Sequence, residues 1–438
     1  RGGLKTMVIR LRGGASCAAM AALLLVGIAP WARASGFAIV EQGARGMGFA
    51  GAFTAVANDP SAIYWNAGGI GFLKGKNLYL GGNYFWPSFD FAGADPFPGT
   101  SSLATSESAR FGTVTAYYTH QFSERVVFGL GVHSPFALKT DWADPDRFPG
   151  RFVAQATSLS SLSINPTVGF RVVERLSVGV GFEYRLASLD YRRKVPTINP
   201  FNLKVADIAR ADLSTDTGSG FGFNLGILAK PSDEWAFGLA YRHKVTVDFT
   251  GATVYNPIPT GNSQLDTLVS ATLPNGSTPF TTSLVFPGSF SAGLAYTTDN
   301  WTFTGQADYV QWSSFETFDL VYTTRPDLSQ SLPQGYSNTW DFRLGAERRL
   351  TPSWAVRAGY AREKSPVPPE SLSPFLPDSN RNAFSAGGTW TNGRARLDAG
   401  FRYVTGSERS TEGRSRDAFD GSYKASGVIF GASFGYAF

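Results

Sequence analysis

Short stretches in which apolar residues alternate strictly with polar or small ones recur along most of this chain. In residues 235–242, WAFGLAYR, one parity holds tryptophan, phenylalanine, leucine and tyrosine, and the other holds alanine, glycine and arginine. Successive side chains of a β-strand point to opposite faces, so this spacing places the apolar residues together on one face. A strand with one apolar face and aromatic residues at its ends is typical of a transmembrane β-barrel, whose outer surface contacts lipid.

The same alternation predicts an antiparallel barrel of fourteen strands. An even number is what bacterial outer-membrane barrels require, and the wall must close because every backbone N–H and C=O group in hydrocarbon needs a partner. Tight turns are expected in the periplasm, and the long connections at about 195–216, 251–282, 323–337, 365–380 and 407–423 outside the cell. The predicted strands are 76–91, 108–122, 125–138, 152–172, 175–194, 217–230, 234–250, 283–298, 300–322, 338–350, 353–364, 381–391, 394–406 and 424–438.

Composition and hydropathy exclude two other classes of protein. After residue 34 no segment approaches eighteen consecutive apolar residues, which excludes a helical membrane protein. The net charge of +5 includes a basic N-terminus, and no basic tract is interleaved with aromatic residues, so we expect no nucleic acid partner. Charged residues are 17% of the chain, against ~25% in typical soluble domains, which suits a wall that faces lipid.

Residues 1–34 are predicted to be a secretory signal peptide. Basic residues precede the apolar run 17–29, and the segment ends in the A-x-A pattern of Ala32 to Ala34, so cleavage would leave Ser35 as the first residue. The lone cysteine, Cys17, lies inside this segment. We therefore expect no disulfide and no cysteine-based metal site in the mature chain.

Residues 35–75 differ from the rest of the chain, because they lack alternation and are rich in glycine and alanine. Small residues allow backbone to pack closely against backbone, which suits a compact segment in a tight space. The stretch GFAIVEQGARGMGFAGAF, followed by NDPSAIYWN, resembles the N-terminal plug, or hatch, of the FadL-type outer-membrane transporters of hydrophobic compounds. The resemblance implies a plug at 35–75 inside the lumen of a barrel at 76–438.

The resemblance also implies a function, passive uptake of a hydrophobic compound across the outer membrane of a Gram-negative bacterium. Long-chain fatty acids are the expected substrate. Uptake of aromatic hydrocarbons is an alternative, and a structural or adhesin-like barrel without a substrate is an alternative of another class. In the family, the loops at 195–216 and 251–282 form a groove that captures substrate, and the apolar spacing predicts amphipathic helices at 205–213 and 263–273. The alternative is that the two loops pack on one another as a lid.

Four residues are candidates for substrate binding. Phe37 matches a family residue that lies near the bound ligand. Arg185, Arg242 and Arg357 fall on the lumen-facing parity of predicted strands, where one or two cations could bind a carboxylate. The alternative is that these arginines pair with acidic side chains, because charges in a confined lumen need compensation.

Asn66, Ala67 and Gly68 are expected to contribute to plug gating, because they occupy the place of the family's Asn-Pro-Ala. Without the proline, the backbone φ angle of this turn is less restricted. We expect Asn66 to end a short helix and to bond to neighbouring backbone, in a left-handed conformation if the turn requires one.

Ser134, Pro135 and Phe136 are expected to form a lateral opening in the wall. Proline cannot donate a hydrogen bond within a sheet and is confined to edges and bulges, but a closed barrel has no edge. Pro135 lies in the body of a predicted strand, so a local kink is expected there. Resemblance agrees, because the family has an inward kink in its third strand. The alternative is that Pro135 lies above the bilayer.

The remaining expectations concern partners and chemistry. The C-terminal strand, Val428 to Phe438, alternates throughout and ends on phenylalanine, resembling the signal that outer-membrane assembly machinery recognises. The other expected partners are outer-membrane lipids, and we expect a monomer. His120, His133 and His243 are scattered and no Gly-x-Ser-x-Gly motif is present, so we expect no metal, no cofactor, no catalytic residues and no enzyme activity.

Overall fold

The computed structural model describes residues 36–107, 109–274 and 276–438, and the predicted signal peptide lies outside these residues. All of the described residues belong to one compact unit made mainly of antiparallel β-strands. Within the described part of the chain, no helix is long and apolar enough to cross a membrane.

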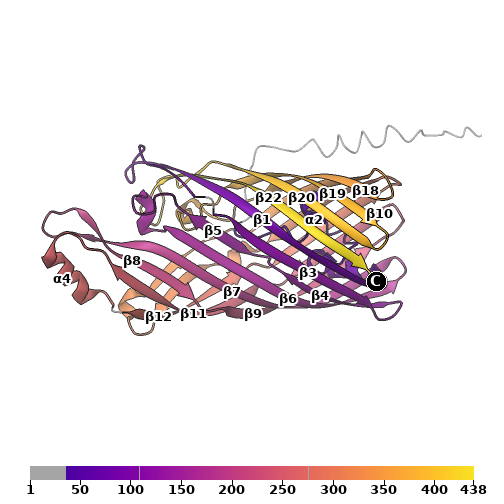
Figure 1. The fold of residues 1–438 in the computed structure, drawn as a ribbon, viewed down its shortest axis with the longest axis horizontal. Coiled ribbons are helices and arrows are strands. Elements are labelled where there is room, and N and C mark those ends of the chain that lie inside the picture. The colour runs from indigo at the N-terminus through magenta and orange to yellow at the C-terminus, as the bar shows by residue number, and fades with distance from the viewer. Residues whose placement is uncertain (1–35, 108, 275) are drawn as a thin grey trace, which may run out of the picture. The chain divides into compact units, whose positions relative to one another are not determined.

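Antiparallel pairing between neighbouring strands closes the sheet into a barrel (Figure 1). The last strand, β22, pairs with the first, β1, along a register from Asn77–Ala437 to Gly93–Gly421. The ring runs through β1 (Lys76–Gly93), β3 (Phe111–Gln121), β4 (Val126–His133), β6 (Ala156–Val173), β7 (Leu176–Ile198), β9 (Gly218–Ala229), β10 (Trp235–Arg242), β13 (Ser289–Thr297), β14 (Trp301–Val310), β17 (Thr339–Arg349), β18 (Trp354–Glu363), β19 (Asn380–Asn392), β20 (Ala395–Ser407) and β22 (Gly421–Ala437).

Two further strands complete the wall at the end away from the short turns. They are β11 (Val245–Pro257) and β12 (Ser277–Phe286), which pair with each other. β11 also pairs with β8 (Val205–Thr215), and β12 with β15 (Thr317–Tyr322). The wall has sixteen strands, so the predicted number of fourteen is wrong. The error arises because predicted strands 234–250 and 283–298 are each interrupted, at His243–Lys244 and at Pro287–Gly288.

The long connections contain more regular structure than expected. Residues 205–213 were predicted to be a helix but lie in β8, because they extend the hairpin with β7 and pair from Asp190–Ser214 to Ile198–Val205. The second predicted helix is present as α4 (Ser263–Thr272). The other short elements are β2 (Leu103–Thr105), β5 (Ala137–Asp141), β8 (Val205–Thr215), β15 (Thr317–Tyr322), β16 (Gln330–Pro333), β21 (Arg409–Ser410), η2 (Pro149–Phe152), η3 (Trp312–Ser314), η4 (Pro326–Leu328) and η5 (Pro369–Ser371).

The two faces of the wall follow the alternation seen in the sequence. On β17, Trp340 and Phe342 are about half exposed on the outer face, whereas Asp341 and Arg343 are buried on the inner face. Large apolar side chains cover the outside of the other ring strands in the same way. The outer surface therefore suits lipid, and the interior holds the charged groups.

The N-terminal segment, residues 36–75, lies inside the ring. Its helix α2 (Ala44–Gly48) packs against β19 and β20, and its 3-10 helix η1 (Ala67–Phe72) packs against β6, β7 and β9 on another part of the wall. The helix α3 (Ala62–Trp65) joins them. Glycines of the wall allow this close approach, because a Cβ atom at Gly179 would lie 2.2 Å from the carbonyl oxygen of Ala67.

Candidate functional site

Phe37 is enclosed by aromatic rings from three distant parts of the chain. Its ring lies 4.9 Å from Trp312, 5.8 Å from Phe136, 6.0 Å from Phe315 and 6.1 Å from Phe286, measured between ring centroids. Three of these contacts are edge-to-face, a geometry that stabilises an aromatic pair by about 0.5–1.5 kcal/mol beyond burial. Phe37 is 5% exposed, so the aromatic cage holds the start of the described chain in place.

Gly36 is fixed by two charged side chains. Its backbone N–H donates to Asp378 Oδ2 at 3.3 Å, and its carbonyl oxygen accepts from Arg381 Nη2 at 2.9 Å. Arg381 also pairs with Asp378 Oδ1 at 2.9 Å. Gly36 has a positive φ of 55°, and a Cβ atom there would lie 2.7 Å from Trp312, so glycine is required. Sequence reasoning missed Asp378 and Arg381, because neither belongs to a recognisable motif.

The wall is interrupted where the sequence predicts a kink. Strand β4 ends at His133 and β5 begins at Ala137, so Ser134, Pro135 and Phe136 lie between two strands that both pair with β6. The N-terminal segment bonds to this break. The N–H of Ile39 donates to the carbonyl oxygen of Pro135 at 2.9 Å, and the N–H of Ala137 donates to that of Phe37 at 3.1 Å.

One side of the break borders a gap in strand pairing. On β3, residues 111–115 pair with β1, but pairing of β3 with β4 stops at Ala116–Val132. Among the described residues, β5 pairs with β6 and no strand pairs with this part of β3 on its other side. The wall is therefore incomplete between β3 and β5.

Two cavities lie on either side of residues 38–40. The first, about 110 Å³, is lined by Phe85 and Phe111 near the gap and by Leu138 of β5. The second, about 100 Å³, is lined by Phe136 and Arg242 among others. Small-molecule sites usually enclose about 300–1,000 Å³. Each cavity is smaller than that, so a large ligand requires residues 38–40 to move.

The structure brings Arg185 and Arg242 together through Glu183. Arg185 Nη2 lies 2.5 Å from Glu183 Oε1, and Arg242 Nη1 lies 2.6 Å from Glu183 Oε2. The Arg185 guanidinium also lies over Phe136, 4.8 Å from the ring centroid. Arg185 is 1% exposed, and its Nη1 atom has no hydrogen-bond partner among the described residues. Two arginines share one carboxylate here, so this site has a cationic excess next to the aromatic cage.

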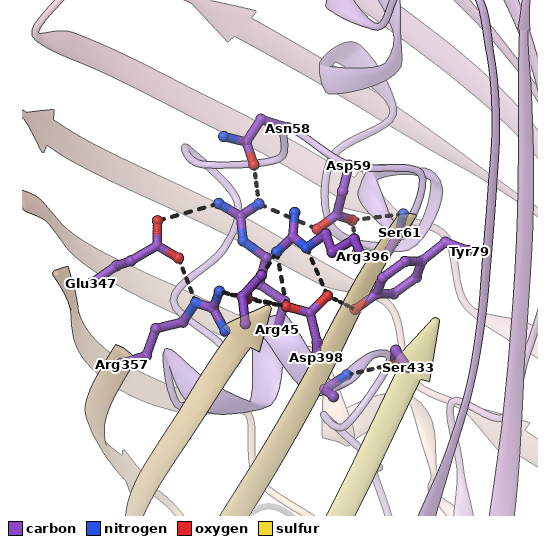
Figure 2. Close-up of polar contacts among 12 residues, drawn as sticks. Arg45, Asn58, Asp59, Ser61, Tyr79, Glu347, Arg357, Arg396, Asp398 and Ser433 are labelled. Atoms are coloured by element: carbon purple, nitrogen blue, oxygen red, sulfur yellow. Dashed lines mark hydrogen bonds and ion pairs between the residues drawn. The ribbon is translucent and has the colours of Figure 1, made fainter. Parts of the chain in front are cut away.

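Arg357 lies in a different cluster, away from the cage. Figure 2 shows it between Glu347, 2.5 Å from its Nε, and Asp398, 3.5 Å from its Nη2. Arg45 of α2 joins the same cluster through Glu347 at 3.6 Å and Asp59 at 3.3 Å. Burial disfavours the charge of Arg45, but the two carboxylates outweigh burial and raise its pKa. These arginines are compensated by acids, and the cluster ties the N-terminal segment to the wall.

Asn66 holds the turn between α3 and η1. Its Nδ2 donates to the carbonyl oxygens of Thr54 at 2.8 Å and Ile227 at 2.9 Å, and its Oδ1 accepts from Gly68 N at 3.0 Å. Asn66 is extended, with φ −164°, so a left-handed conformation is not needed there. Ala67 and Gly68 press against β7 and β9, where a Cβ atom on Gly68 would lie 2.9 Å from the carbonyl oxygen of Gly226.

Comparison with known proteins identifies the family. Residues 25–438 match the family model described as "Outer membrane protein transport protein (OMPP1/FadL/TodX)". This chain belongs to that family. The OMPP1/FadL/TodX family consists of transport proteins and not of enzymes, and the expectations of family, of no enzyme activity and of a Gram-negative outer-membrane location are confirmed.

Relatives extend over almost the whole chain. A long-chain fatty acid transport protein of Escherichia coli O6:H1 is 25% identical over 95% of this chain and 97% of its own length. A 47 kDa outer membrane protein of Pasteurella multocida is 26% identical over 94% of this chain and 96% of its own length.

Solved structures share the FadL-like fold. A Pseudomonas aeruginosa FadL homologue is 21% identical, covers 92% of this chain and 100% of its own, and has a TM-score of 0.80. The toluene transporter TbuX of Ralstonia pickettii is 16% identical, covers 90% of this chain and 98% of its own, and has a TM-score of 0.66.

Proposed function

We propose that this protein takes up long-chain fatty acids passively across the outer membrane. The observation that carries the proposal is Arg185, a buried cation with a free Nη1 atom beside the aromatic cage of Phe37. A carboxylate supplies the acceptor that this donor lacks, and a charge-assisted hydrogen bond is stronger than a neutral one. The hydrocarbon chain would replace Phe37 among the rings of the cage. Long-chain fatty acid transport is also the named activity of relatives that match almost the whole chain.

Capture outside the cell is the first step. The hairpin tip between β7 and β8 exposes apolar side chains, with Leu203 81% exposed. On the nearby helix α4, Leu265 and Val269 pack against Ile208 of β8, while Leu268 remains 54% exposed. Exposed apolar side chains on connected elements mark a binding surface for an apolar ligand. We propose that these elements collect substrate before it enters the lumen.

Movement of the N-terminal segment is the second step. We propose that residues 35–75 act as a plug, in which the Arg45 cluster and Asn66 keep the later part fixed. Residues 36–40 are held by Asp378, by the aromatic cage and by backbone bonds to the wall break. A ligand that enters the cage displaces Phe37 and so weakens all three restraints, which frees the first residues of the plug.

Lateral exit is the third step. Once residues 37–39 leave the break at Ser134, Pro135 and Phe136, the gap between β3 and β5 connects the lumen with the membrane interior. An apolar substrate then reaches lipid without crossing water, where each exposed CH₂ group would cost about 0.8 kcal/mol.

An aromatic hydrocarbon is the alternative substrate, and the all-aromatic cage of Phe37 favours it. Direct binding of oleate and of toluene to the purified protein distinguishes the two. For a fatty acid transporter, Arg185→Gln weakens oleate binding about tenfold or more and leaves toluene binding unchanged. Arg175→Gln, which alters an exposed periplasmic ion pair, serves as the control. Equal binding of oleate to the wild type and Arg185→Gln contradicts the carboxylate proposal, and binding of neither ligand indicates a structural or adhesin-like barrel.

A further inference from the structure

A row of small residues crosses the lipid-facing side of the barrel. The strand register places Gly388 opposite Ala399, Ala399 opposite Ala432, and Ala432 opposite Gly82, on strands β19, β20, β22 and β1. Ala399 and Ala432 are exposed on the outer face. We call this row the trough. Neighbouring strands lie about 4.8 Å apart, so the four residues span roughly 14 Å.

Large side chains border the trough on both sides. On each of the four strands, the next outward-facing residue toward the short turns is large, and the register aligns these residues as Trp390, Leu397, Phe434 and Leu80. On β20, β22 and β1, the next outward-facing residue away from the short turns is also large, and the register aligns Phe401, Phe430 and Tyr84. A hollow in the surface coincides with this arrangement, and Trp354, Trp390, Leu397, Phe434 and Leu80 line it together with trough residues.

The trough is inclined across the membrane. It begins at Gly82, six positions after Lys76 at the start of β1, and ends at Gly388. The same line of the register continues through the exposed Val356 to Arg348, next to the last residue of β17. Six residues of a strand rise about 20 Å, or about 15 Å along the membrane normal for strands tilted by ~40°. The hydrocarbon core is about 30 Å thick, so Gly82 lies near the middle of the bilayer and Arg348, at the other end of this line, at the periplasmic interface.

The interfacial end is basic and aromatic. Arg348 lies over Trp301, with its guanidinium carbon 5.3 Å from the ring centroid. Arg348 and Arg349 line a second hollow together with residues 298–301, which include one exposed acid, Asp299. Within the described part of the chain, neither arginine is within ion-pair distance of an acidic side chain. Tryptophan is enriched at membrane interfaces, and arginine is the side chain best suited to phosphate.

We propose that the trough binds one anionic phospholipid of the inner leaflet, with its phosphate at Arg348 and Arg349 and one acyl chain along Gly388, Ala399 and Ala432. Hydrophobicity does not select this lipid, because lipid tails are as apolar as the protein surface. The attraction comes from close packing in the hollow and from the charge of the headgroup. The proposal depends on the outer-membrane location and not on the transported compound.

The test measures phospholipid that stays bound to the full mature protein in detergent, by native mass spectrometry after exchange from vesicles of phosphatidylglycerol or phosphatidylethanolamine. The variant Arg348→Gln removes the charge, and the double variant Ala399→Leu with Ala432→Leu fills the trough. Arg125→Gln, in another periplasmic turn, and Ala292→Leu, at a lipid-facing position of β13, are the matched controls. Heat-modifiable migration on gels verifies that every variant is a folded barrel.

We expect the wild type to retain one phosphatidylglycerol in preference to phosphatidylethanolamine, and both trough variants to retain about tenfold less. The controls retain as much as the wild type. Equal retention by all proteins, or equal loss in the controls, would overturn the proposal. A dimer of the wild type that dissociates in the leucine variant would overturn it as well, because the hollow would then be covered by a second copy of the chain.

Discussion

The backbone N–H of Gly36 donates to the carboxylate of Asp378 at 3.3 Å, although the two residues are 342 positions apart in the chain. Asp378 is 1% exposed and also accepts from Ser365 Oγ at 2.6 Å. This carboxylate therefore connects the start of the N-terminal segment to the long connection between β18 and β19. Removing its charge should release residues 36–40 without disturbing the wall.

The first prediction is that Asp378→Asn makes the N-terminal segment accessible. An amide pairs less strongly with Arg381 than a carboxylate does, so the anchoring of Gly36 weakens. We expect faster proteolysis near residues 36–42 and a raised basal permeability to small hydrophobic probes, with normal heat-modifiable migration. Asp299→Asn, in an exposed turn, is the control and should leave both properties unchanged. Proteolysis as slow as in the wild type would show that Asp378 does not hold the segment.

The second prediction concerns the aromatic cage. Phe37→Ala removes the ring that the four surrounding aromatic side chains enclose, and so removes a large apolar contact. If the ligand takes the place of Phe37 among these rings, removing this competing ring strengthens ligand binding about tenfold while the barrel still assembles. If Phe37 serves only as an anchor, the affinity stays the same and the segment loses order, which limited proteolysis detects.

The third prediction concerns the wall break. In Pro135→Val the backbone regains an N–H donor, which favours continuous pairing of β4 and β5 with β6 across residues 134–136. We expect slower uptake of the hydrophobic substrate by a barrel that migrates normally on gels. Uptake at the original rate would argue against exit through this break.

The fourth prediction concerns Asn66. Asn66→Val removes three side-chain hydrogen bonds and leaves the buried carbonyl oxygen of Thr54 and the partly buried one of Ile227 without the amide donor. Orphaned buried polar groups cost about 1–3 kcal/mol each, so the plug should be destabilised by about 2 kcal/mol or more. Increased protease sensitivity of the plug and altered uptake are the expected results. If the protease sensitivity and the uptake of the variant both equal those of the wild type, Asn66 serves only as the end of a short helix.

Local alternation predicted the ring strands well, because the period of two requires only neighbouring residues. It failed at His243–Lys244 and Pro287–Gly288, where two apparent strands are interrupted. At the second of these interruptions β12 ends at Phe286, which is one wall of the aromatic cage. The interruption at Pro287–Gly288 thus contributed to the wrong strand number, and it also kept Phe286 from being predicted as a residue of the aromatic cage.

The site itself was only partly predictable. Phe37 and Pro135 carry local signals, a family motif and a proline within a strand. Asp378 and Trp312 carry none, because their roles follow from contacts between connections that are distant in sequence. Strand alternation in the sequence placed the side chains of Arg185 and Arg357 in the lumen. Only the pairing of strands in the structure shows that the two arginines belong to different ion-pair clusters.

The most direct test of lateral exit is to lock the N-terminal segment onto the wall break. Ala38 and Phe136 form an isolated antiparallel bridge between the flanking backbone bonds, and such pairs have the close Cα spacing that a disulfide needs. The mature chain is expected to contain no cysteine, so Ala38→Cys with Phe136→Cys introduces one defined pair, and each single variant serves as a control.

Uptake of radiolabelled oleate by cells carrying the double variant is measured before and after reduction. The account predicts that uptake is blocked in the oxidised double variant and restored on reduction, whereas reduction leaves the uptake of each single variant at its own level. Equal uptake by the oxidised and reduced double variant would contradict it, because substrate would then leave the lumen without the segment moving from the break.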